Sequence, residues 1–543
     1  MPARLLVAFV AALLGLGLLA PDAVAQGEAA GPGAVEQDVG PVGDDAHGAH
    51  GEDDVALVEG EGAHGDADEH HGPPPPLFLV LPFVVLLLMI ATGPLFYPHH
   101  WHHHYPKYAV ALGVIVAGYY LVVLHSTTPL VHAAEEYISF IALLASLFVA
   151  SGCILIKTDF AGSARVNATL LGVGAAISNL IGTTGASMLL IRPYLRLNRG
   201  RIRPYHVIFF IFIVSNVGGA LTPIGDPPLF LGFLRGVPFF WTVTHIWYIW
   251  IPTILVLLGL FYLIDKRNKA ESVRELAEEA GDPDVEPGEY ADVPTVHTRR
   301  HLVIEGKAGF GWLAVIIASV FLDPNVFDWV PDLHELFHIP FGIREVIMFG
   351  VCFAAYKTAK PEVLRGNEFN FEPIREVAWL FVGIFLTMQP ALELIRLFAS
   401  ANADALSPTT FFFGTGILSG VLDNAPTYVS FLSAAMGKFG LDVNVPQQVF
   451  EFALGHDASV GFYDPATTFY LQAISVAAVF FGALTYIGNG PNFMVKAIAE
   501  SAGVPTPSFV AYVVKYALPI LIPIYVVVWL IFFSGFVVPI PAG

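Results

Sequence analysis

Long apolar runs separated by short polar connections dominate the chain. A helix needs roughly 20 apolar residues to cross a bilayer, at about 1.5 Å per residue. Ten runs qualify, some only just: 77–96, 108–124, 137–156, 206–233, 245–264, 308–322, 343–358, 376–399, 468–499 and 510–535. The pattern predicts an all-α polytopic membrane protein.

Two further apolar runs, 167–192 and 408–437, have polar residues at their centres and are too short to cross twice. Ser178-Asn179 interrupts the first run and Asp423-Asn424 interrupts the second. Polar groups at membrane depth are costly unless they line a cavity or hold an ion. We expect each run to form a re-entrant hairpin that enters and leaves on the same side.

The loop charges agree with this topology. Lys and Arg gather around the first hairpin, in 265–307 and in 357–365, whereas acidic residues gather in the alternate loops. The positive-inside rule places the basic loops in the cytoplasm, and the alternation holds only if neither hairpin crosses. Each half then has about five crossings and one hairpin, so the second half is inverted relative to the first. This predicts repeats at 77–264 and 308–543, joined by a cytoplasmic linker at 265–307.

A sequence repeat marks one broken helix in each half. Residues 219–231 read GALTPIGDPPLFL and residues 482–494 read GALTYIGNGPNFM, with eight of thirteen positions identical. Each copy interrupts an apolar run with Thr, Gly, Pro and an acid or amide. Glycine and proline end the helical hydrogen-bond ladder and free backbone carbonyls. Paired breaks of this kind indicate the binding site of a transporter.

Composition narrows the class further. Of 543 residues, 55% are hydrophobic and only 13% are charged, with a mean hydropathy of +0.64. Much of the formal charge of -20 comes from two segments outside the apolar runs, 26–76 and 271–292. No large basic surface is available for a nucleic acid. The two cysteines, Cys153 and Cys352, lie in apolar runs and form no disulfide framework or metal-ligand spacing.

The N-terminus has the features of a targeting segment. Arg4 precedes an apolar run, and Ala23-Val24-Ala25 resembles a cleavage site. Residues 1–25 are therefore a signal peptide or, alternatively, an uncleaved first helix. Residues 26–76 are acidic, contain histidines and have too few large apolar residues to fold. We expect them to form a disordered tail outside the cytoplasm.

The polar residues of the hairpins and breaks form a candidate cation site. Hydroxyls, amide oxygens and freed carbonyls are hard oxygen donors suited to Na⁺. The candidate ion-binding residues are Ser178, Asn179, Thr183, Thr222, Gly225, Asp226, Asp423, Asn424, Thr427, Thr485, Gly488 and Asn489. A buried carboxylate must be neutralised, and a proton and a cation can do so in turn, so Asp226 and Asp423 are candidates for proton coupling. The alternative is that these residues are helix caps, Asp226 among them.

Four stretches resemble the NhaD-type sodium/proton antiporters of the ion transporter superfamily: ISNLIGTTGASMLLIRP, SNVGGALTPIGDPPLFLGFL, LDNAPTYVSF and YIGNGPNFMVKAIAE. The resemblance covers roughly 77–535. It implies two hairpins meeting two unwound helices, a transport domain that moves like an elevator against a scaffold, and a homodimer. The superfamily also includes sodium-coupled carboxylate symporters and metalloid exporters. Its anion symporters carry Ser-Asn-Thr at both hairpin tips, whereas this chain has Ser-Asn-Leu and Asp-Asn-Ala, which favours a cation.

Histidine motifs suggest a different class, a membrane metalloenzyme. His99 to His104 contain H-x-x-H-H, but no second histidine box is present to complete a di-iron site, and a wet cytoplasmic loop is the simpler interpretation. His334 to His338 read H-E-x-x-H between Pro331 and Pro340, which leaves room for barely two helical turns. The histidines of the 26–76 tail sit among acids and could collect divalent cations.

These observations predict a secondary transporter, not an enzyme, that exchanges Na⁺ or Li⁺ for H⁺ across a bacterial inner membrane. A sodium-coupled carboxylate symporter and a metalloid exporter are the alternatives. No phosphate-binding loop indicates ATP as the energy source. We expect no cofactor, with Na⁺ and H⁺ as the transported ions and the lipid bilayer and a second copy of the chain as partners. The N-terminal tail and the C-terminus are expected outside the cytoplasm.

Overall fold

The computed structural model describes residues 74–158, 162–279, 302–322, 329–331, 333, 339–457, 462–463 and 465–539. The predicted targeting segment at 1–25, nearly all of the 26–76 tail and the His334 to His338 motif lie outside the described residues.

The first half contains three helices, a helix with a sharp internal turn, a broken helix and one long helix. In chain order the elements are η2 (Leu77–Val80), α2 (Leu81–Phe96), α3 (Pro98–Val122), α4 (Thr128–Gly152), β1 (Leu155–Thr158), α5 (Ala164–Leu197), α6 (Pro204–Ile213), η3 (Val217–Leu221), α7 (Pro227–Leu234) and α8 (Trp241–Glu279).

The second half follows the same order, with a few short additions. Its elements are β2 (Leu302–Glu305), α9 (Ala308–Val320), α11 (Ile343–Thr358), α12 (Pro361–Gly366), α13 (Glu372–Ala401), η5 (Ala403–Ala405), α14 (Pro408–Val421), α15 (Asn424–Lys438), α16 (Pro446–Leu454), β3 (His456–Asp457), β4 (Phe462–Tyr463), α17 (Pro465–Phe481), η6 (Gly482–Leu484), α18 (Gly490–Ser501), α19 (Phe509–Tyr512), the π-helical turn η7 (Val513–Ala517) and α20 (Leu518–Phe532). Strands β1 and β2 pair antiparallel, and so do β3 and β4.

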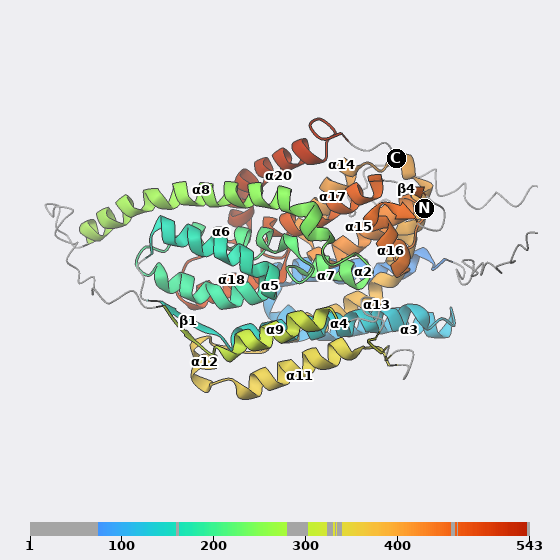
Figure 1. The fold of residues 1–543 in the computed structure, drawn as a ribbon, viewed down its shortest axis with the longest axis horizontal. Coiled ribbons are helices and arrows are strands. Elements are labelled where there is room, and N and C mark those ends of the chain that lie inside the picture. Colours follow the sequence, from blue (N-terminus) through green and yellow to red (C-terminus); the bar gives the residue numbers. More distant parts are fainter. Residues whose placement is uncertain are drawn as a thin grey trace, which may run out of the picture.

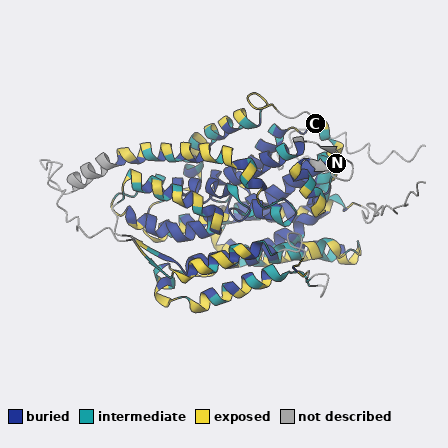
Figure 2. Cartoon of the chain, viewed as in Figure 1, coloured by how far each residue is buried: buried dark blue, intermediate teal, exposed yellow. Residues whose placement is uncertain are grey.

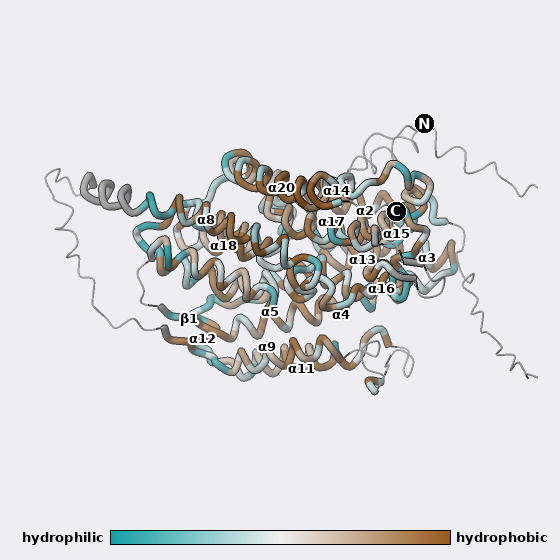
Figure 3. Tube along the Cα trace, turned by 45° about the horizontal axis from the view of Figure 1, so that its top comes forward, coloured by the Kyte–Doolittle hydropathy of each residue, from teal (hydrophilic) through white to brown (hydrophobic). Residues whose placement is uncertain are grey.

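Among the described residues, nine helical segments are long and apolar enough to cross a membrane. They coincide with the predicted runs, with two differences. One of the nine is the hairpin α5, and the first two helices of the second half, α9 and α11, are shorter, with 13 and 16 residues. The outer faces of α8, α11 and α20 are apolar and exposed, as expected of helices that contact lipid (Figures 2 and 3). The chain is an all-α polytopic membrane protein, as predicted.

Helix α5 is a hairpin. Gly182 inside it has φ 77° and ψ 155°, a conformation that residues with a side chain rarely adopt. Asn167, near the start of α5, and Asn198, just beyond its end, exchange side-chain hydrogen bonds of 2.7 and 2.9 Å. In a straight helix these residues would be roughly 45 Å apart. The hairpin is confirmed, but it turns at Gly182, so the prediction that Ser178-Asn179 forms its tip is wrong.

Helices α14 and α15 form the second hairpin, which turns at Leu422-Asp423. They have 14 and 15 residues, so each is roughly 21–23 Å long. That is too short for a hydrocarbon core of about 30 Å. At the open end, Nζ of Lys438 donates a 3.0 Å hydrogen bond to the carbonyl of Ala403. This hairpin lies where the sequence predicts it.

The two hairpins open at opposite ends of α8. The open end of α5 contacts Asp265, which accepts a 2.9 Å hydrogen bond from Asn167. At the other end of α8, Trp241 donates a 2.7 Å hydrogen bond to the carbonyl of Ala453 in α16, the helix that follows the second hairpin. Trp241 and Asp265 are roughly 36 Å apart along the helix, about the thickness of a membrane core. The second half is therefore inverted relative to the first.

The helices form two layers that α13 joins (Figure 1). Helices α3, α4, α9 and α11 make up one layer, in which α4 packs against α9 and α11. The hairpins, the broken helices, α8 and α20 make up the other layer. Helix α13 packs against α3 and α4 on one side and against α15 on the other. Helix α4 also contacts α5 and α7, so it borders both the hairpin and the break of the first half.

Two predicted loops are partly helical. His99 to His104 lie in the first two turns of α3, so the prediction of a loop there is wrong. Pro98 starts this helix, at a position where its missing N–H costs nothing. Helix α8 continues to Glu279, so the first part of the predicted 265–307 linker belongs to the helix, and residues 280–301 lie outside the described part of the chain.

Candidate functional site

The first helix break lies between α6 and α7. Helix α6 ends at Ile213 and α7 begins at Pro227, with η3 and an extended stretch between them. Gly219 and Gly225 face each other across the break, where a side chain on Gly225 would overlap the carbonyl oxygen of Gly219. Pro227 has no N–H to continue the helical ladder and instead starts α7. Local sequence therefore forces the helix open here.

The second break, between α17 and α18, repeats the backbone of the first. The corresponding residues Thr222 and Thr485 have φ of -134° and -136°. Asp226 and Asn489 also correspond, with φ of -145° and -153°. Backbone atoms crowd Gly488 in the same way as its counterpart in the first break. The sequence repeat is thus a structural repeat.

The first hairpin docks on the first break through backbone and amide groups. The N–H of Thr183 donates to the carbonyl of Gly225 at 2.8 Å. Oδ1 of Asn179 accepts from the N–H of Leu221 at 2.8 Å, and the hydroxyl of Thr222 donates to the carbonyl of Asn179 at 2.5 Å. These bonds fix the hairpin tip against the unwound segment.

The second hairpin docks on the second break in a corresponding way. The N–H of Asn424 donates to the carbonyl of Gly488 at 3.2 Å. Oδ1 of Asp423 accepts from the N–H of Ala425 at 3.0 Å and so caps α15. The hydroxyl of Thr427 donates to the carbonyl of Asp423 at 2.9 Å. For Asp423 the role of helix cap therefore holds in this structure.

Asp226 lies where both halves of the chain meet. Its side chain is buried, with 1% of the residue exposed. Oδ1 accepts hydrogen bonds from the hydroxyl of Thr183 at 2.7 Å and from Nδ2 of Asn489 at 2.8 Å. Oδ2 accepts one from Nδ2 of Asn424 at 2.7 Å. The carboxylate thus joins the first hairpin, the second hairpin and the second break.

Asp226 does not cap the helix that follows it. It occupies the position before the first turn of α7, but its side chain accepts no hydrogen bond from that turn. Among the described residues, no ion pair involves Asp226. The helix-cap interpretation is therefore wrong for this residue, and all its observed hydrogen-bond donors are neutral.

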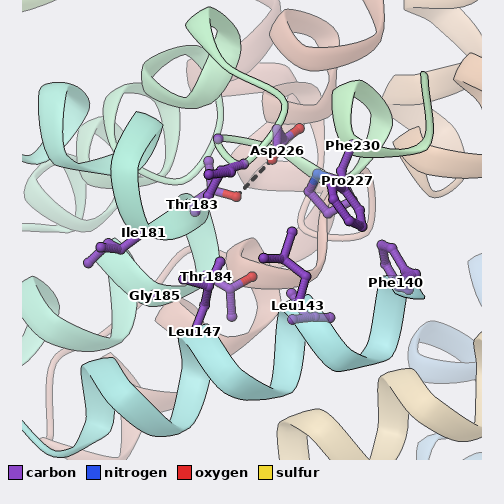
Figure 4. A pocket seen from close by; sticks show the side chains of 14 residues that line it. Phe140, Leu143, Leu147, Ile181, Thr183, Thr184, Gly185, Asp226, Pro227 and Phe230 are labelled. Carbon is purple, nitrogen blue, oxygen red and sulfur yellow. Dashed lines mark hydrogen bonds between the residues drawn. The ribbon is translucent and has the colours of Figure 1, made fainter. Parts of the chain in front are cut away.

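A small cavity of ≈ 20 Å³ adjoins Asp226 (Figure 4). Thr183, Thr184 and Asp226 line one side, and the apolar residues Phe140, Leu143, Leu144 and Leu147 of α4 line the other. A cavity of this size holds one water molecule or a small ion. Since α4 belongs to the opposite layer, the cavity lies between the two layers of helices.

Among the described residues, the remaining candidates do not hydrogen-bond to the carboxylate of Asp226. The hydroxyl of Ser178 donates to the carbonyls of Gly174 and Val214 at 2.9 and 2.8 Å. The hydroxyl of Thr485 accepts from the N–H groups of Ile487 and Gly488 at 3.1 Å each. Of the twelve candidates, the structure brings the side chains of Thr183, Asn424 and Asn489 directly onto Asp226.

Sequence reasoning missed Asn216. It is fully buried, and its Nδ2 donates to Oδ1 of Asn492 at 2.6 Å, across the two halves. Oδ1 of Asn216 and Oδ1 of Asn424 are buried and accept no hydrogen bond from the described residues. The available signal was an amide inside an apolar run, three residues before the repeat.

Aromatic donors satisfy carbonyls that the breaks leave free. Nε1 of Trp250 in α8 donates to the carbonyls of Val217 and Gly218 at 2.8 and 3.2 Å. The hydroxyl of Tyr512 in α19 donates to the carbonyl of Ala483 at 2.8 Å. Helix α8 follows α7, and α19 follows α18, so the two donors come from corresponding positions in the two halves. Nothing in the local sequence pairs these residues with the breaks.

Comparison with known families decides the class. A family model described as "Putative citrate transport" matches residues 74–533. The chain belongs to this family. The match confirms a membrane transporter and does not test the resemblance to NhaD-type antiporters. A comparison with curated proteins found no match.

The histidine motifs form no metal centre in the part of the chain that the structure describes. No group of three or more His, Cys, Asp or Glu side chains there is placed to hold a metal ion. His99 to His104 are mostly exposed on α3, and the ring of His100 stacks on that of His104 at 4.4 Å. The geometry gives a metalloenzyme no support from these residues.

Proposed function

We propose that this member of the citrate-transport family exchanges Na⁺ (or Li⁺) for H⁺ at Asp226. The observation that carries the proposal is a buried carboxylate with three neutral hydrogen-bond donors and no cationic partner among the described residues. An ionised carboxylate in such a place costs several kcal/mol unless a positive species neutralises it. A proton and a small cation each meet that need, and they exclude each other.

The donors around Asp226 suit both occupants. An amide has an oxygen as well as an NH₂ group, and a hydroxyl accepts as readily as it donates. Rotation of Asn489 or Thr183 would turn an oxygen toward a bound cation. Oδ1 of Asn424 accepts no hydrogen bond within the part of the chain that the structure describes, so it could accept one or bind the cation without rotation. Neutral oxygens with one carboxylate form a ligand set suited to a dehydrated monovalent cation.

The charge of Asp226 favours a cation over an anionic substrate, although half-helix ends converge on the site. The second arm of α5 and helices α7, α15 and α18 begin at the centre, and such N-termini stabilise anions. Asp226 already supplies an anion there, directly before α7. A substrate carboxylate would have to lie beside it and would be repelled. The cavity of ≈ 20 Å³ also has no room for a multi-carbon acid in this conformation.

Sodium-coupled carboxylate transport is the second candidate. The description of the family favours it. It would require a conformation in which the space between α4 and the first hairpin widens and a positive group approaches the substrate. Under this alternative, Asp226 would bind the coupling Na⁺ and the carboxylate would bind elsewhere between the two layers.

Transport by either route requires the site to face each side in turn. The α4 residues that line the cavity are apolar, so movement of the layers breaks no polar contact at the cavity itself. The ion pair of Arg235 with Glu136 of α4 would have to separate in such a movement. We infer a bacterial inner membrane, with the N-terminal tail and the C-terminus outside the cytoplasm, and a homodimer, as the resemblance implies. Na⁺ and H⁺ need no further cofactor.

Purified protein in liposomes tests the proposal. Vesicles that contain a pH-sensitive dye are given gradients of Na⁺, Li⁺, K⁺ or choline, and in parallel radiolabelled citrate or succinate. We expect Na⁺ and Li⁺ gradients to move protons, Asp226→Asn to abolish the movement, and Glu362→Gln, at an exposed position, to leave it unchanged. Sodium-dependent uptake of a carboxylate without proton movement would establish the second candidate instead.

A further inference from the structure

We propose that the exchange carries no net charge, with one proton traded for one Na⁺ at Asp226, and that Asp423 is a positioning residue. This inference rests on the proposed function. It adds the net charge moved in each transport cycle and the separate roles of the two acids, Asp226 and Asp423. It follows from which ionisable groups share the site and from what surrounds them.

Asp226 is the one ionisable side chain in its hydrogen-bonded cluster. Its three partners, Thr183, Asn424 and Asn489, carry no charge. Helix α4 contributes apolar side chains, α5 contributes Thr183, and α18 begins with the uncharged residues Gly490 to Met494. Asp423, at the tip of the second hairpin and directly before Asn424, is a further acid whose charge acts on Asp226.

Asp423 caps helix α15 and does not hydrogen-bond to the Asp226 cluster. Its Oδ1 accepts from the N–H of Ala425, two residues on, and this bond fixes the first turn of α15. Asn424, inside that turn, is thereby held with its N–H on Gly488 and its side chain on Asp226. Asp423 is only partly buried, whereas Asp226 is 1% exposed. The N–H of Ala425 and the N-terminus of α15 both stabilise a negative charge on Asp423.

One exchangeable acid fixes the charge balance. With a proton on Asp226, or with Na⁺ beside it, the cluster is neutral, and only a neutral cluster crosses the apolar surface of α4 at low cost. A charge that remains on Asp423 moves forward and returns in every cycle and adds nothing to the net transfer. Each turnover then exports one Na⁺ and imports one proton, and the membrane potential does no work on the exchange.

Liposome flux at a clamped potential tests this inference. Potassium gradients with valinomycin set the potential, while tracer ²²Na⁺ and a pH dye follow both ions in the same vesicles. We expect one proton per Na⁺, and net flux that stops when the Na⁺ and H⁺ gradients are equal, at positive, zero and negative potentials alike. Asp423→Asn keeps an N-cap side chain, so it should lower the rate but retain both the one-for-one ratio and the indifference to potential. Asp226→Asn should move neither ion.

Other outcomes overturn specific parts. A ratio near two protons per Na⁺, or a point of zero net flux that shifts with the potential, would refute the electroneutral exchange while leaving cation–proton exchange intact. Loss of coupling in Asp423→Asn, in protein that still elutes as a single species and unfolds at the wild-type temperature, would make Asp423 a second exchangeable site. If wild-type protein moves no protons in response to Na⁺ or Li⁺, the proposed function fails, and this inference fails with it.

Discussion

Asp226 accepts a 2.8 Å hydrogen bond from Asn489, the residue at the corresponding position of the second half. The two have nearly the same backbone conformation, with φ of -145° and -153°. One internal repeat therefore places an acid and an amide at equivalent positions and pairs them across the interface between the halves. A second acid at Asn489 would restore the symmetry but would bring two carboxylates together.

That conflict gives the first prediction. Asn489→Asp should lower the thermal unfolding temperature at pH 8 and much less at pH 5. Two carboxylates in hydrogen-bond contact cannot both be ionised in a buried site, and acid supplies the proton that relieves the repulsion. Stability of the variant should thus fall as the pH rises. Unfolding temperatures of wild type and variant in detergent at both pH values provide the measurement, and an equal loss at pH 5 and pH 8 would speak against the contact.

The break glycines give a second prediction. Gly225→Ala should destabilise the protein severely and stop transport, because the new methyl group would overlap the carbonyl oxygen of Gly219. Gly259→Ala is the matched control on α8, where a Cβ would have no neighbour within 4 Å. The control should be neutral or stabilising by up to about 1 kcal/mol, from helix propensity alone. Both are measured as the unfolding temperature and the flux rate, and a tolerated Gly225→Ala would contradict the tight break.

A third prediction concerns the donor that supports the first break. Trp250→Phe removes the N–H that bonds to the carbonyls of Val217 and Gly218. The change should cost about 1–3 kcal/mol because the buried carbonyl of Val217 loses this donor, whereas that of Gly218 keeps its bond from Nδ2 of Asn179. Trp247→Phe, on the same helix but 50% exposed, should change stability little. Denaturation and Na⁺ half-saturation are compared for both variants. A larger effect at Trp247 would mean that Trp250 does not support the break.

Arg235 and Glu136 give a fourth prediction. Arg235, just after α7, is bonded at 2.9 Å to Glu136 of α4, and their side chains are only 3% and 15% exposed. Glu136→Gln leaves a buried guanidinium without its counter-charge, a change that typically costs 3–5 kcal/mol at about this degree of burial.

The exposed pair Arg365 and Glu362, at 3.8 Å and 77% and 70% exposed, provides the control. Glu362→Gln should cost at most about 1 kcal/mol. Unfolding of the two Gln variants under the same conditions is the comparison. Equal effects would show that the pair between α7 and α4 contributes no more than a surface contact.

Local pattern reveals the framework of this molecule. The apolar runs, both hairpins and both breaks follow from the spacing of apolar residues and from Gly and Pro, since these act within a few residues of each other. The turn of the first hairpin is displaced from Ser178-Asn179 to Gly182, because the left-handed conformation there, and not the polar pair, decides where the chain reverses.

The hydrogen bonds around Asp226 could not be predicted from the local sequence pattern. Asp226 finds its partners at Thr183, Asn424 and Asn489, which are 43, 198 and 263 residues away. Only the packing of the two halves brings Asp226 into hydrogen-bond contact with both of them, while Asp423 caps its own helix. Asn216 was missed for the same reason, since its partner Asn492 lies 276 residues further on.

Sodium binding to purified protein as a function of pH tests the central claim most directly. If Na⁺ and H⁺ compete for Asp226, the apparent dissociation constant for Na⁺ should rise at low pH by about tenfold per pH unit, and Asp226→Asn should bind no Na⁺ at any pH. A dissociation constant independent of pH, or undiminished binding to Asp226→Asn, would contradict the account.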